Sequence, residues 1–470
     1  MHQLSTCFYQ LASLSIAIAI AIAIAIAITS TSQCLAAGYG INENSASYMA
    51  TGFAGRASNP VDASIAANNP AGISFIPAYI FSAGSAVILK GGEFEGQFTR
   101  PPRFGGLVSG ETISGKTTDF QQTKLVPFGH FSMPVNEKIA FGLSAYGPYG
   151  VELDYKSNWP GKYFADKTSV KVINLQGTLS FKLHNNVAIG FGLIGSHVKG
   201  KLTQSAGVPD FLPLDATIEG DDNTFGWNVG AIWQVSEQTM LGVVYHSQLD
   251  FTLDGDTKAH GKLAIPENPV INASVNDKVG AKLDINMPER AALSITHKPA
   301  PRWTLMADAT WTRWSRFEEF YVKARKNMTV HLSGGFPNLP PEITTNPSSY
   351  IPMNWKDVWA YSAGASYEVS PRWLLRFGYM RDNSPVNDKN RTARSADADR
   401  NWFTCGANWQ ATESLGIDLS YAYVVLDKGK ISESKYKGTP PHAVDESYGK
   451  LTGKYKNSSH IVAAQLNYRF

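Results

Sequence analysis

Apolar and polar residues alternate with a period of two in many separate segments of this chain. In Phe225–Gln234 the odd positions are mostly large and apolar, and the even positions are mostly small or polar. The same pattern recurs in residues 187–193, 241–246, 373–379 and 415–423. Because successive side chains of a strand point to opposite faces, this period predicts β-strands with one apolar face. After residue 28, no apolar stretch approaches the ~20 residues of a membrane-spanning helix, which excludes a helical inner-membrane protein.

The aromatic residues indicate that the apolar face meets lipid. Trp303 and Trp311 share one face of a predicted strand, eight residues apart. At ~3.3 Å per residue and a tilt of ~40°, they lie ~20 Å apart along a barrel axis, close to the spacing of two interfacial aromatic girdles. The charge balance, Lys+Arg 42 against Asp+Glu 39, argues against a nucleic-acid partner, which would need an excess of basic residues.

The connections between the predicted strands give their number. Six short polar turns are expected, around residues 136–137, 185–186, 236–237, 299–301, 370–371 and 412–413. Longer polar segments separate them, near residues 91–119, 151–167, 203–223, 254–282, 317–354, 382–398 and 427–456. We therefore predict an all-β fold, an antiparallel transmembrane β-barrel of about 14 strands in residues 78–470.

The last predicted strand is typical of a barrel of the bacterial outer membrane. One of its faces ends on the terminal Phe470 and carries Val462, Ala464, Leu466 and Tyr468. In barrel families, a C-terminal aromatic residue on an amphipathic last strand is what the outer-membrane assembly machinery recognises. We therefore expect this protein in the outer membrane, in contact with its lipid.

Residues 1–36 are expected to be a signal peptide. Residues 11–28 are almost wholly apolar, and a polar stretch and the small-residue cleavage site Cys34-Leu35-Ala36 follow. Residues 1–10 contain no Lys or Arg, so an uncleaved anchor helix is the alternative. Cleavage after Ala36 leaves Cys405 as the one cysteine, and we therefore expect neither a disulfide framework nor a metal cluster.

Residues 37–77 lack a sustained alternation and are rich in Ala, Gly, Ser and Asn. They form either a periplasmic tail or a plug inside the barrel. Because the lumen of a 14-stranded barrel would leak unless it were filled, we expect a plug, called the hatch below.

No catalytic or cofactor-binding motif accompanies the strands. Gly190, Gly192 and Gly195 form a GxGxxG, but they lie inside a predicted strand and not in the strand-to-helix turn that binds a dinucleotide. We interpret them as a small-residue face of the lumen. His246 and Ser247 are adjacent and point to opposite faces, which argues against a catalytic pair. We therefore expect neither an enzyme nor a bound cofactor or metal.

Gly147-Pro148-Tyr149-Gly150 interrupts the third predicted strand. Proline lacks the amide hydrogen that strand pairing needs, and the glycines permit an irregular backbone. One interpretation is the ordinary end of a strand. The other is a kink that opens a gap in the wall. Because unpaired backbone groups are costly in a membrane, such a kink requires contact with the hatch.

A series of motifs runs in order through nearly all of the predicted mature chain. In the hatch they are Ala37-Gly38-Tyr39, Asn42-Glu43, Gly55-Arg56-Ala57, Asp62-Ala63-Ser64 and Asn69-Pro70-Ala71-Gly72. In the barrel they are Phe225-Gly226-Trp227-Asn228-Val229-Gly230, Asn286-Met287-Pro288-Glu289, Trp311-Thr312-Arg313-Trp314-Ser315-Arg316-Phe317, Arg381-Asp382-Asn383-Ser384-Pro385-Val386, Asn390-Arg391 and Asp397-Ala398-Asp399-Arg400-Asn401-Trp402. Together they resemble the FadL family of outer-membrane long-chain fatty-acid transport proteins, which includes aromatic hydrocarbon channels.

The resemblance implies a monomeric barrel, plugged by the hatch, that carries hydrophobic molecules inward by passive diffusion, with long-chain fatty acids as the expected substrate. In the family, substrate binds an apolar groove on the outer loops, passes to a lumenal pocket touched by the N-terminus, and leaves sideways at a kink in strand three. The matching residues are Tyr39 for the pocket, Asn69, Pro70 and Ala71 for the hatch, and Gly147, Pro148 and Gly150 for the kink.

The chain departs from the family pattern in its outer loops and charges. The third long loop is shorter than in the best-known members. A basic residue that follows strand five in some members, and can pair with a carboxylate, is Gln204 here, and Arg376 is a candidate substitute. The alternatives are an aromatic hydrocarbon channel of the same family and a general diffusion porin. The loop residues expected to bind substrate, beside Val208, are Phe211, Leu212 and Leu214.

Overall fold

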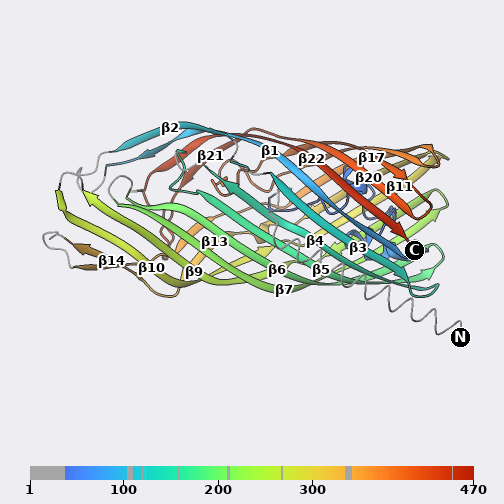
Figure 1. Ribbon diagram of the computed structural model, residues 1–470, viewed down its shortest axis with the longest axis horizontal. Helices are drawn as coiled ribbons and strands as arrows, with labels where there is room; N and C mark the ends of the chain where they lie inside the picture. Colours follow the sequence, from blue (N-terminus) through green and yellow to red (C-terminus); the bar gives the residue numbers. More distant parts are fainter. Residues whose placement is uncertain are drawn as a thin grey trace.

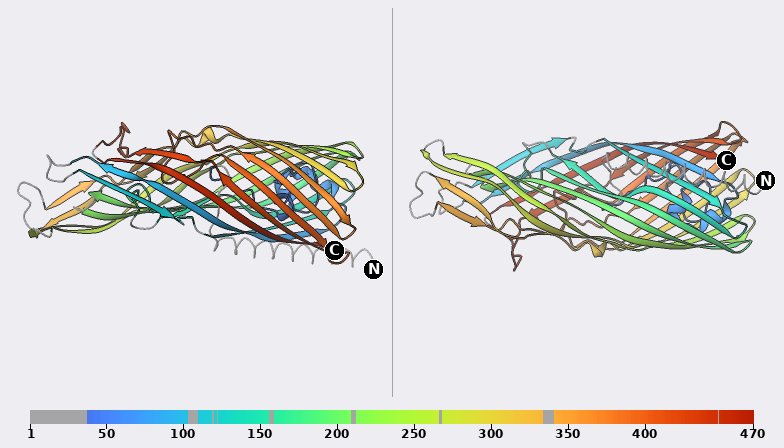
Figure 2. Two further views of the ribbon diagram at one scale, coloured as in Figure 1. Left: turned by 90° about the horizontal axis from the view of Figure 1, so that it is seen from above. Right: turned by 60° about the horizontal axis from the view of Figure 1, so that its bottom comes forward.

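The computed structural model describes residues 38–102, 110–118, 120–121, 123–155, 159–208, 212–265, 268–333, 341–446 and 448–470. They form an elongated barrel whose strands run obliquely to its long axis (Figure 1). The hatch lies inside the barrel, near the end at which the chain terminates, which we call the hatch end (Figure 2). At the opposite end, the loop end, strands extend well beyond the hatch (Figure 1).

Fourteen strands form the wall, as predicted. Each is antiparallel to the next along the chain, and the last pairs with the first, which closes the sheet. The wall strands are β1 (Ile80–Arg100), β3 (Lys124–Pro134), β4 (Ile139–Asp154), β5 (Lys167–His184), β6 (Val187–Val208), β7 (Leu212–Ser236), β8 (Thr239–His246), β11 (Arg290–Ala300), β12 (Trp303–Thr312), β17 (Val358–Ser370), β18 (Trp373–Asp382), β19 (Arg400–Gln410), β20 (Leu415–Leu426) and β22 (Lys450–Arg469).

The six predicted turns are confirmed, because each joins two consecutive wall strands. Asn136-Glu137, for example, connects β3 to β4, and Ser370-Pro371 connects β17 to β18. The apolar face of the alternation points outward, and Trp227, Trp303 and Phe470 are among its exposed side chains. This apolar belt is the surface that a barrel presents to lipid.

The seven long polar segments lie between consecutive wall strands, as predicted, but several of them are not irregular loops and contain strands. These strands continue the wall beyond the apolar belt or form hairpins at the loop end. In this region the alternation is inverted: apolar residues such as Phe251 and Leu253 are buried, whereas Thr252 and Asp254 between them are exposed. Strands in water turn their polar face outward. The additional strands are β2 (Glu111–Thr118), β9 (Leu249–Ile265), β10 (Asn268–Met287), β13 (Glu319–Ala324), β14 (Met328–Ser333), β15 (Glu342–Thr345), β16 (Ser349–Pro352) and β21 (Gly429–Ser434).

The hatch contains three short helical segments, α2 (Ala46–Met49), α3 (Ile65–Asn68) and the 3₁₀-helix η1 (Pro70–Phe75), and η3 (Trp314–Arg316) lies in a later connection. The hatch backbone comes very close to the wall at glycines. A Cβ built on Gly190 would lie 2.3 Å from the Ala71 nitrogen, and one on Gly242 would lie 1.8 Å from the Ala57 oxygen. Gly190 and Gly192 of the GxGxxG therefore belong to a small-residue lumen face, as interpreted, whereas Gly195 lies on the outward face of β6, near the exposed Phe225. Within the described part of the chain, no helix has the length and apolarity needed to cross a membrane.

Candidate functional site

β4 loses its regular pairing at the residues predicted to form a kink. β3 pairs with β4 only up to Ala145, although β4 continues beyond it. On the other side, the register between β4 and β5 shifts around Gly147 and Pro148, which form a bulge. Residues 144–153 are all buried, on both faces of the strand, so this part of β4 lies inward of the wall.

The first residues of the hatch pair with the edge of β4 that β3 leaves free. They form an isolated antiparallel bridge with β4. The Ile41 amide donates a hydrogen bond to the Pro148 carbonyl (2.8 Å), and the Gly150 amide donates to the Tyr39 carbonyl (2.7 Å). The hatch thus satisfies backbone groups that a break in the wall would otherwise leave unpaired. This is the contact that the second interpretation of the sequence required.

The irregularity at the kink resides in the bulge and not in a left-handed backbone at Gly150. In the described residues, the glycines with positive φ are Gly38, Gly52, Gly55 and Gly449. Gly150 lies in extended backbone and faces Lys171 of β5 in the register. A side chain at position 150 is therefore compatible with the backbone conformation of this strand.

Tyr39 and Gly38 are tightly enclosed beside the kink. Only 1% of Tyr39 is exposed, and its ring centroid lies 5.5 Å from that of Phe317 and 5.1 Å from that of Trp355. The Gly38 amide donates to a carboxylate oxygen of Asp397 (2.8 Å). With its φ of +64° and only 2.7 Å between a hypothetical Cβ and the Trp355 ring, position 38 accepts glycine alone.

The Asn69-Pro70-Ala71 motif anchors the hatch to the wall. The Asn69 Oδ1 accepts a hydrogen bond from the Ala71 amide (3.1 Å) and so caps η1, whose first residue is Pro70. The Asn69 Nδ2 donates to the carbonyls of Ala57 in the hatch (2.7 Å) and Ala231 in β7 (3.2 Å). One side chain therefore orders a helix start and ties it to a wall strand.

An aromatic cluster fills the lumen between the kink and the loop end. Tyr155 stacks between Trp159 (3.8 Å between ring centroids) and Phe120 (4.7 Å). Its hydroxyl donates to the Ala393 carbonyl (2.8 Å), which joins the cluster to the connection between β18 and β19. Other buried members are Phe94, Phe98, Tyr163, Phe164 and Tyr455.

Two buried cations, Arg394 and Lys435, converge on Gln204 beside this cluster. Their relative exposures are 2% and 9%. The Arg394 Nη2 and the Lys435 Nζ each donate to the Gln204 Oε1, both at 3.0 Å. Within the described residues neither cation forms a salt bridge, and the Arg394 Nε has no hydrogen-bond partner. We call Arg394 and Lys435 the cation pair.

Burial shifts the pKa values of the ionisable groups at the cation pair. Desolvation, and secondarily the positive charge of Arg394, lowers the pKa of Lys435 to about 7. Burial likewise raises the pKa of Glu433 to about 7, although the Ala393 amide donates to its carboxylate (2.7 Å). Two cations that share one uncharged oxygen form a site at which an anion would be stabilised.

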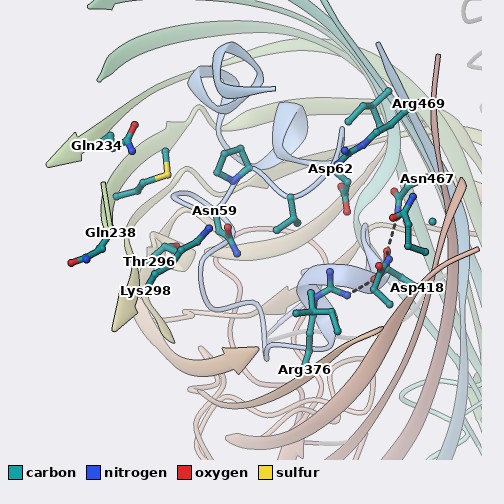
Figure 3. A pocket seen from close by; sticks show the side chains of 18 of the residues that line it. Asn59, Asp62, Gln234, Gln238, Thr296, Lys298, Arg376, Asp418, Asn467 and Arg469 are labelled. Atoms are coloured by element: carbon teal, nitrogen blue, oxygen red, sulfur yellow. Dashed lines mark hydrogen bonds and ion pairs between the residues drawn. The ribbon is translucent and has the colours of Figure 1, made fainter. Parts of the chain in front are cut away.

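Arg376 faces the lumen, as predicted, but it lies at the hatch end and away from the cation pair. It lines a polar cavity of about 430 Å³ between the hatch and the strand ends (Figure 3). Its guanidinium is paired with Asp418, which also accepts hydrogen bonds from Asn408 (3.0 Å) and Asn467 (2.6 Å). Because its charge is already neutralised, Arg376 is a poor partner for a ligand carboxylate.

Of the residues predicted to form an apolar lip, those that the structure describes lie in the backbone of β6 and β7 at the loop end. Phe211 is outside the described residues, whereas Leu212 and Leu214 begin β7 and pair with β6. Lower in the lumen, an apolar slot of about 20 Å³ lies between β5, β6, β7, β9, β10 and β13. Its apolar side chains are Val170, Leu202, Ile218, Leu253, Leu283, Phe320 and Val322.

Sequence reasoning missed the cation pair. Both residues lie in segments predicted as polar loops, 382–398 and 427–456, where no sustained alternation shows which side chains turn inward. The one available signal was the concentration of arginines and aspartates in residues 391–400, which is unusual for an ordinary solvated loop. Among the residues that the structure describes, no group of three or more His, Cys, Asp or Glu side chains is arranged to hold a metal ion.

Comparison with known proteins identifies the family. The family model described as "Outer membrane protein transport protein (OMPP1/FadL/TodX)" matches residues 27–470. A long-chain fatty acid transport protein of Escherichia coli O6:H1 is 25% identical over 434 residues, which cover 86% of this chain and 90% of that protein. A 47 kDa outer membrane protein of Pasteurella multocida is 26% identical and covers 93% of this chain, with 94% of its own length matched.

Solved structures show the same fold. A FadL homologue of Pseudomonas aeruginosa superimposes with a TM-score of 0.77, with 23% identity, and covers 92% of this chain and 100% of its own. The toluene transporter TodX of Pseudomonas putida superimposes with a TM-score of 0.66 and 13% identity, covering 90% of this chain and 97% of its own. The family consists of transport proteins and not of enzymes. The chain belongs to the FadL/TodX family of outer-membrane transport proteins.

Proposed function

We propose that this protein is a passive uptake channel for hydrophobic molecules and that its substrates are long-chain fatty acids. Substrate would bind at the loop end, move to the lumen beside Tyr39 and the aromatic cluster, and leave sideways into the membrane at the kink in β4. The observation that carries the proposal is the cation pair. Relatives named as long-chain fatty acid transport proteins support the same substrate class.

The cation pair favours a fatty acid over an aromatic hydrocarbon. A buried cation that forms no salt bridge is destabilised, and Arg394 and Lys435 lie close enough to share one oxygen. The acid near them, Glu433, has its pKa raised to about 7 by burial and so offsets their charge only in part. A carboxylate in place of the Gln204 amide oxygen would neutralise both and accept charge-assisted hydrogen bonds. A hydrocarbon such as toluene carries no group that could do so.

The surroundings of the cation pair suit an acyl chain. Leu202 and Val170 of the apolar slot lie two residues from Gln204 and Thr168, and Thr168 accepts a hydrogen bond from Arg394 (3.1 Å). A carboxylate held at the cation pair would therefore have apolar surface on the same two strands. Each Å² of tail buried there contributes ~25 cal/mol, which holds the substrate without a covalent or metal contact.

The pairing of β4 supports the proposed exit route. Above Ala145, β4 bonds to the hatch instead of to β3, so the wall can part there without breaking a β3–β4 hydrogen-bond ladder. We expect Gly150→Val to fill the space between the two strands while leaving the apolar belt intact. Uptake of labelled oleate should fall roughly tenfold at equal outer-membrane abundance, whereas oleate binding to the purified variant persists.

Binding measurements test the substrate class. In purified protein, Arg394→Gln together with Lys435→Gln should weaken oleate binding by roughly tenfold or more, because two charge-assisted hydrogen bonds are lost. Binding of oleyl alcohol should change little. Arg302→Gln together with Lys437→Gln is the matched control, since both side chains are exposed. Equal loss for oleate and the alcohol, or tighter binding of toluene than of oleate by the native protein, would refute a fatty-acid substrate.

A further inference from the structure

A row of lysines lies on the outward face of three strands at the loop end, β21, β22 and β2, with β1 between β22 and β2. Lys450, Lys454 and Lys456 lie on β22, Lys430 on β21 and Lys116 on β2, and all are exposed. Between their positions on each strand lie inward-facing residues such as Tyr455, Leu451 and Ile431 that are buried. The alternation therefore points every one of these ammonium groups out of the barrel. We call this set the lysine row.

The strand register places like charges side by side in the lysine row. Lys430 of β21 stands directly opposite Lys454 of β22. Like charges at directly opposed positions destabilise a sheet. On the other side of β22, Glu95 and Glu93 of β1 stand opposite Lys454 and Lys456.

The two glutamates do not balance the lysine row. Glu93 forms its salt bridge with Lys116 of β2 (3.0 Å). Within the described residues, Lys430, Lys450, Lys454 and Lys456 form no salt bridge, and the five lysines and two glutamates leave three positive charges in excess. An external anion would relieve the repulsion between Lys430 and Lys454.

The lysine row continues the lipid-facing surface of β22. On the same outward face, Val462, Leu466 and Tyr468 belong to the apolar belt. His460 lies between the belt and the lysines, and its ring stacks on those of Tyr421 (6.1 Å) and Tyr423 (4.9 Å) of β20, as residues of an aromatic girdle do. Lys456 lies four residues before His460 on β22, which places it ~13 Å farther along the strand toward the loop end. The row therefore begins just beyond the apolar core of the bilayer.

We infer that the lysine row binds the phosphate groups of a lipid in the outer leaflet of the outer membrane, namely lipopolysaccharide. Short turns of outer-membrane barrels face the periplasm, so the loop end is the outer end and the row lies at the level of outer-leaflet headgroups. Basic residues near a membrane surface attract anionic headgroups, and their contributions accumulate along a cluster. Phosphates seated over Lys430 and Lys454 would convert a repulsive pair into a bridge between β21 and β22.

The test compares lipid probes on purified protein in detergent. Diphosphorylated lipid A should bind the native protein, and the quadruple variant Lys430→Gln, Lys450→Gln, Lys454→Gln and Lys456→Gln should bind it at least roughly tenfold more weakly. Lipid A stripped of both phosphates should bind both proteins equally weakly. The matched control removes four exposed lysines elsewhere that form no salt bridge in the described structure: Lys199→Gln, Lys282→Gln, Lys326→Gln and Lys356→Gln.

Three results with the lipid probes would overturn the inference, and a competition with inorganic phosphate gives a fourth. The three are unchanged lipid A affinity in the quadruple variant, equal binding of the two lipids by the native protein, and an equal loss of affinity in the control variant. Inorganic phosphate is the remaining probe. If it alone displaces lipid A at millimolar concentration, the row is a general anion site and the assignment to a lipid fails. Heat-modifiable gel mobility confirms that each variant forms a closed barrel.

Discussion

At the scale of residues, the charged groups at the cation pair should make carboxylate binding depend on pH. The groups that face Lys435 are Arg394, Glu433, and the rings of Phe164 (5.4 Å) and Tyr448 (5.5 Å). Because burial lowers its pKa to about 7, Lys435 loses its proton as the pH rises through that value. Glu433, with its pKa raised to about 7, becomes negative over the same range. Both changes disfavour a carboxylate at higher pH.

Oleate affinity should therefore fall by roughly fivefold between about pH 6 and pH 8, a range in which the carboxyl group of monomeric oleate stays ionised. Oleyl alcohol should bind equally at both values. Lys435→Arg keeps its charge throughout and should reduce the dependence to the contribution of Glu433. Isothermal titration calorimetry at both pH values measures these affinities for the native protein with oleate, the native protein with oleyl alcohol, and Lys435→Arg with oleate. An affinity for oleate that is the same at both pH values would contradict a titrating lysine at the site.

At the scale of elements, the kink is closed near the loop end by an ion pair between strands that no longer share a ladder. The Lys124 Nζ of β3 lies 3.1 Å from the Glu152 Oε1 of β4, and each side chain is 7% exposed. The Asp154 amide also donates to the Phe120 carbonyl there (2.8 Å). The stretch in which β3 and β4 do not pair therefore ends at these contacts on the side of the loop end, and at the last β3–β4 pair, at Ala145, on the side of the hatch end.

Lys124→Met should loosen these contacts. The substitution removes the ion pair between β3 and β4, while Glu152 keeps Lys167 of β5 at 3.6 Å, so the segment around residues 146–155 should exchange its amide hydrogens roughly threefold faster or more. Lys116→Met, which removes the exposed pair with Glu93, should have almost no effect. Hydrogen exchange followed by mass spectrometry reports both. Unchanged protection of 146–155 in Lys124→Met would show that hydrogen bonds alone hold the gap.

The sequence predicts those strands correctly whose alternation of apolar and polar residues has a single cause along the whole strand. In the apolar belt, lipid demands an outward apolar face, so segments such as 225–234 and 415–423 were assigned correctly. At the loop end the environment changes along a single strand, and Phe251 and Leu253 become the inward face of a strand in water. Inverted alternation has the same period, but it lacks the aromatic girdles that identified the barrel. The positions of Arg394 and Lys435 depend on irregular connections, which no periodicity describes.

At the scale of the whole molecule, the hatch packs closely against the barrel wall. His130 and His246 on the lumen side of β3 and β8 contact the carbonyls of Asn44 (2.8 Å) and Ala67 (3.0 Å), so even polar wall residues are used to bind the hatch. In the function proposed above, substrates pass through the loops and the wall, and we expect the hatch to keep ions out. A general diffusion porin would instead require an open axial path.

Removal of residues 38–77, with the signal segment retained, should therefore open the lumen to ions without preventing the barrel from forming. The wall closes through its own strand pairs, and β22 pairs with β1 without help from the hatch, so the variant should reach the outer membrane and keep its heat-modifiable mobility. Its lumen would fill with water, because the lumen face is lined by glycines and polar residues such as Gln176 and Asn228. Single-channel conductance in planar bilayers should rise at least tenfold over the nearly silent native protein. Asn69→Ala, which removes one anchor but keeps the hatch, should give only brief openings. If the deletion variant assembles and its conductance equals that of the native protein, something other than the hatch seals this barrel.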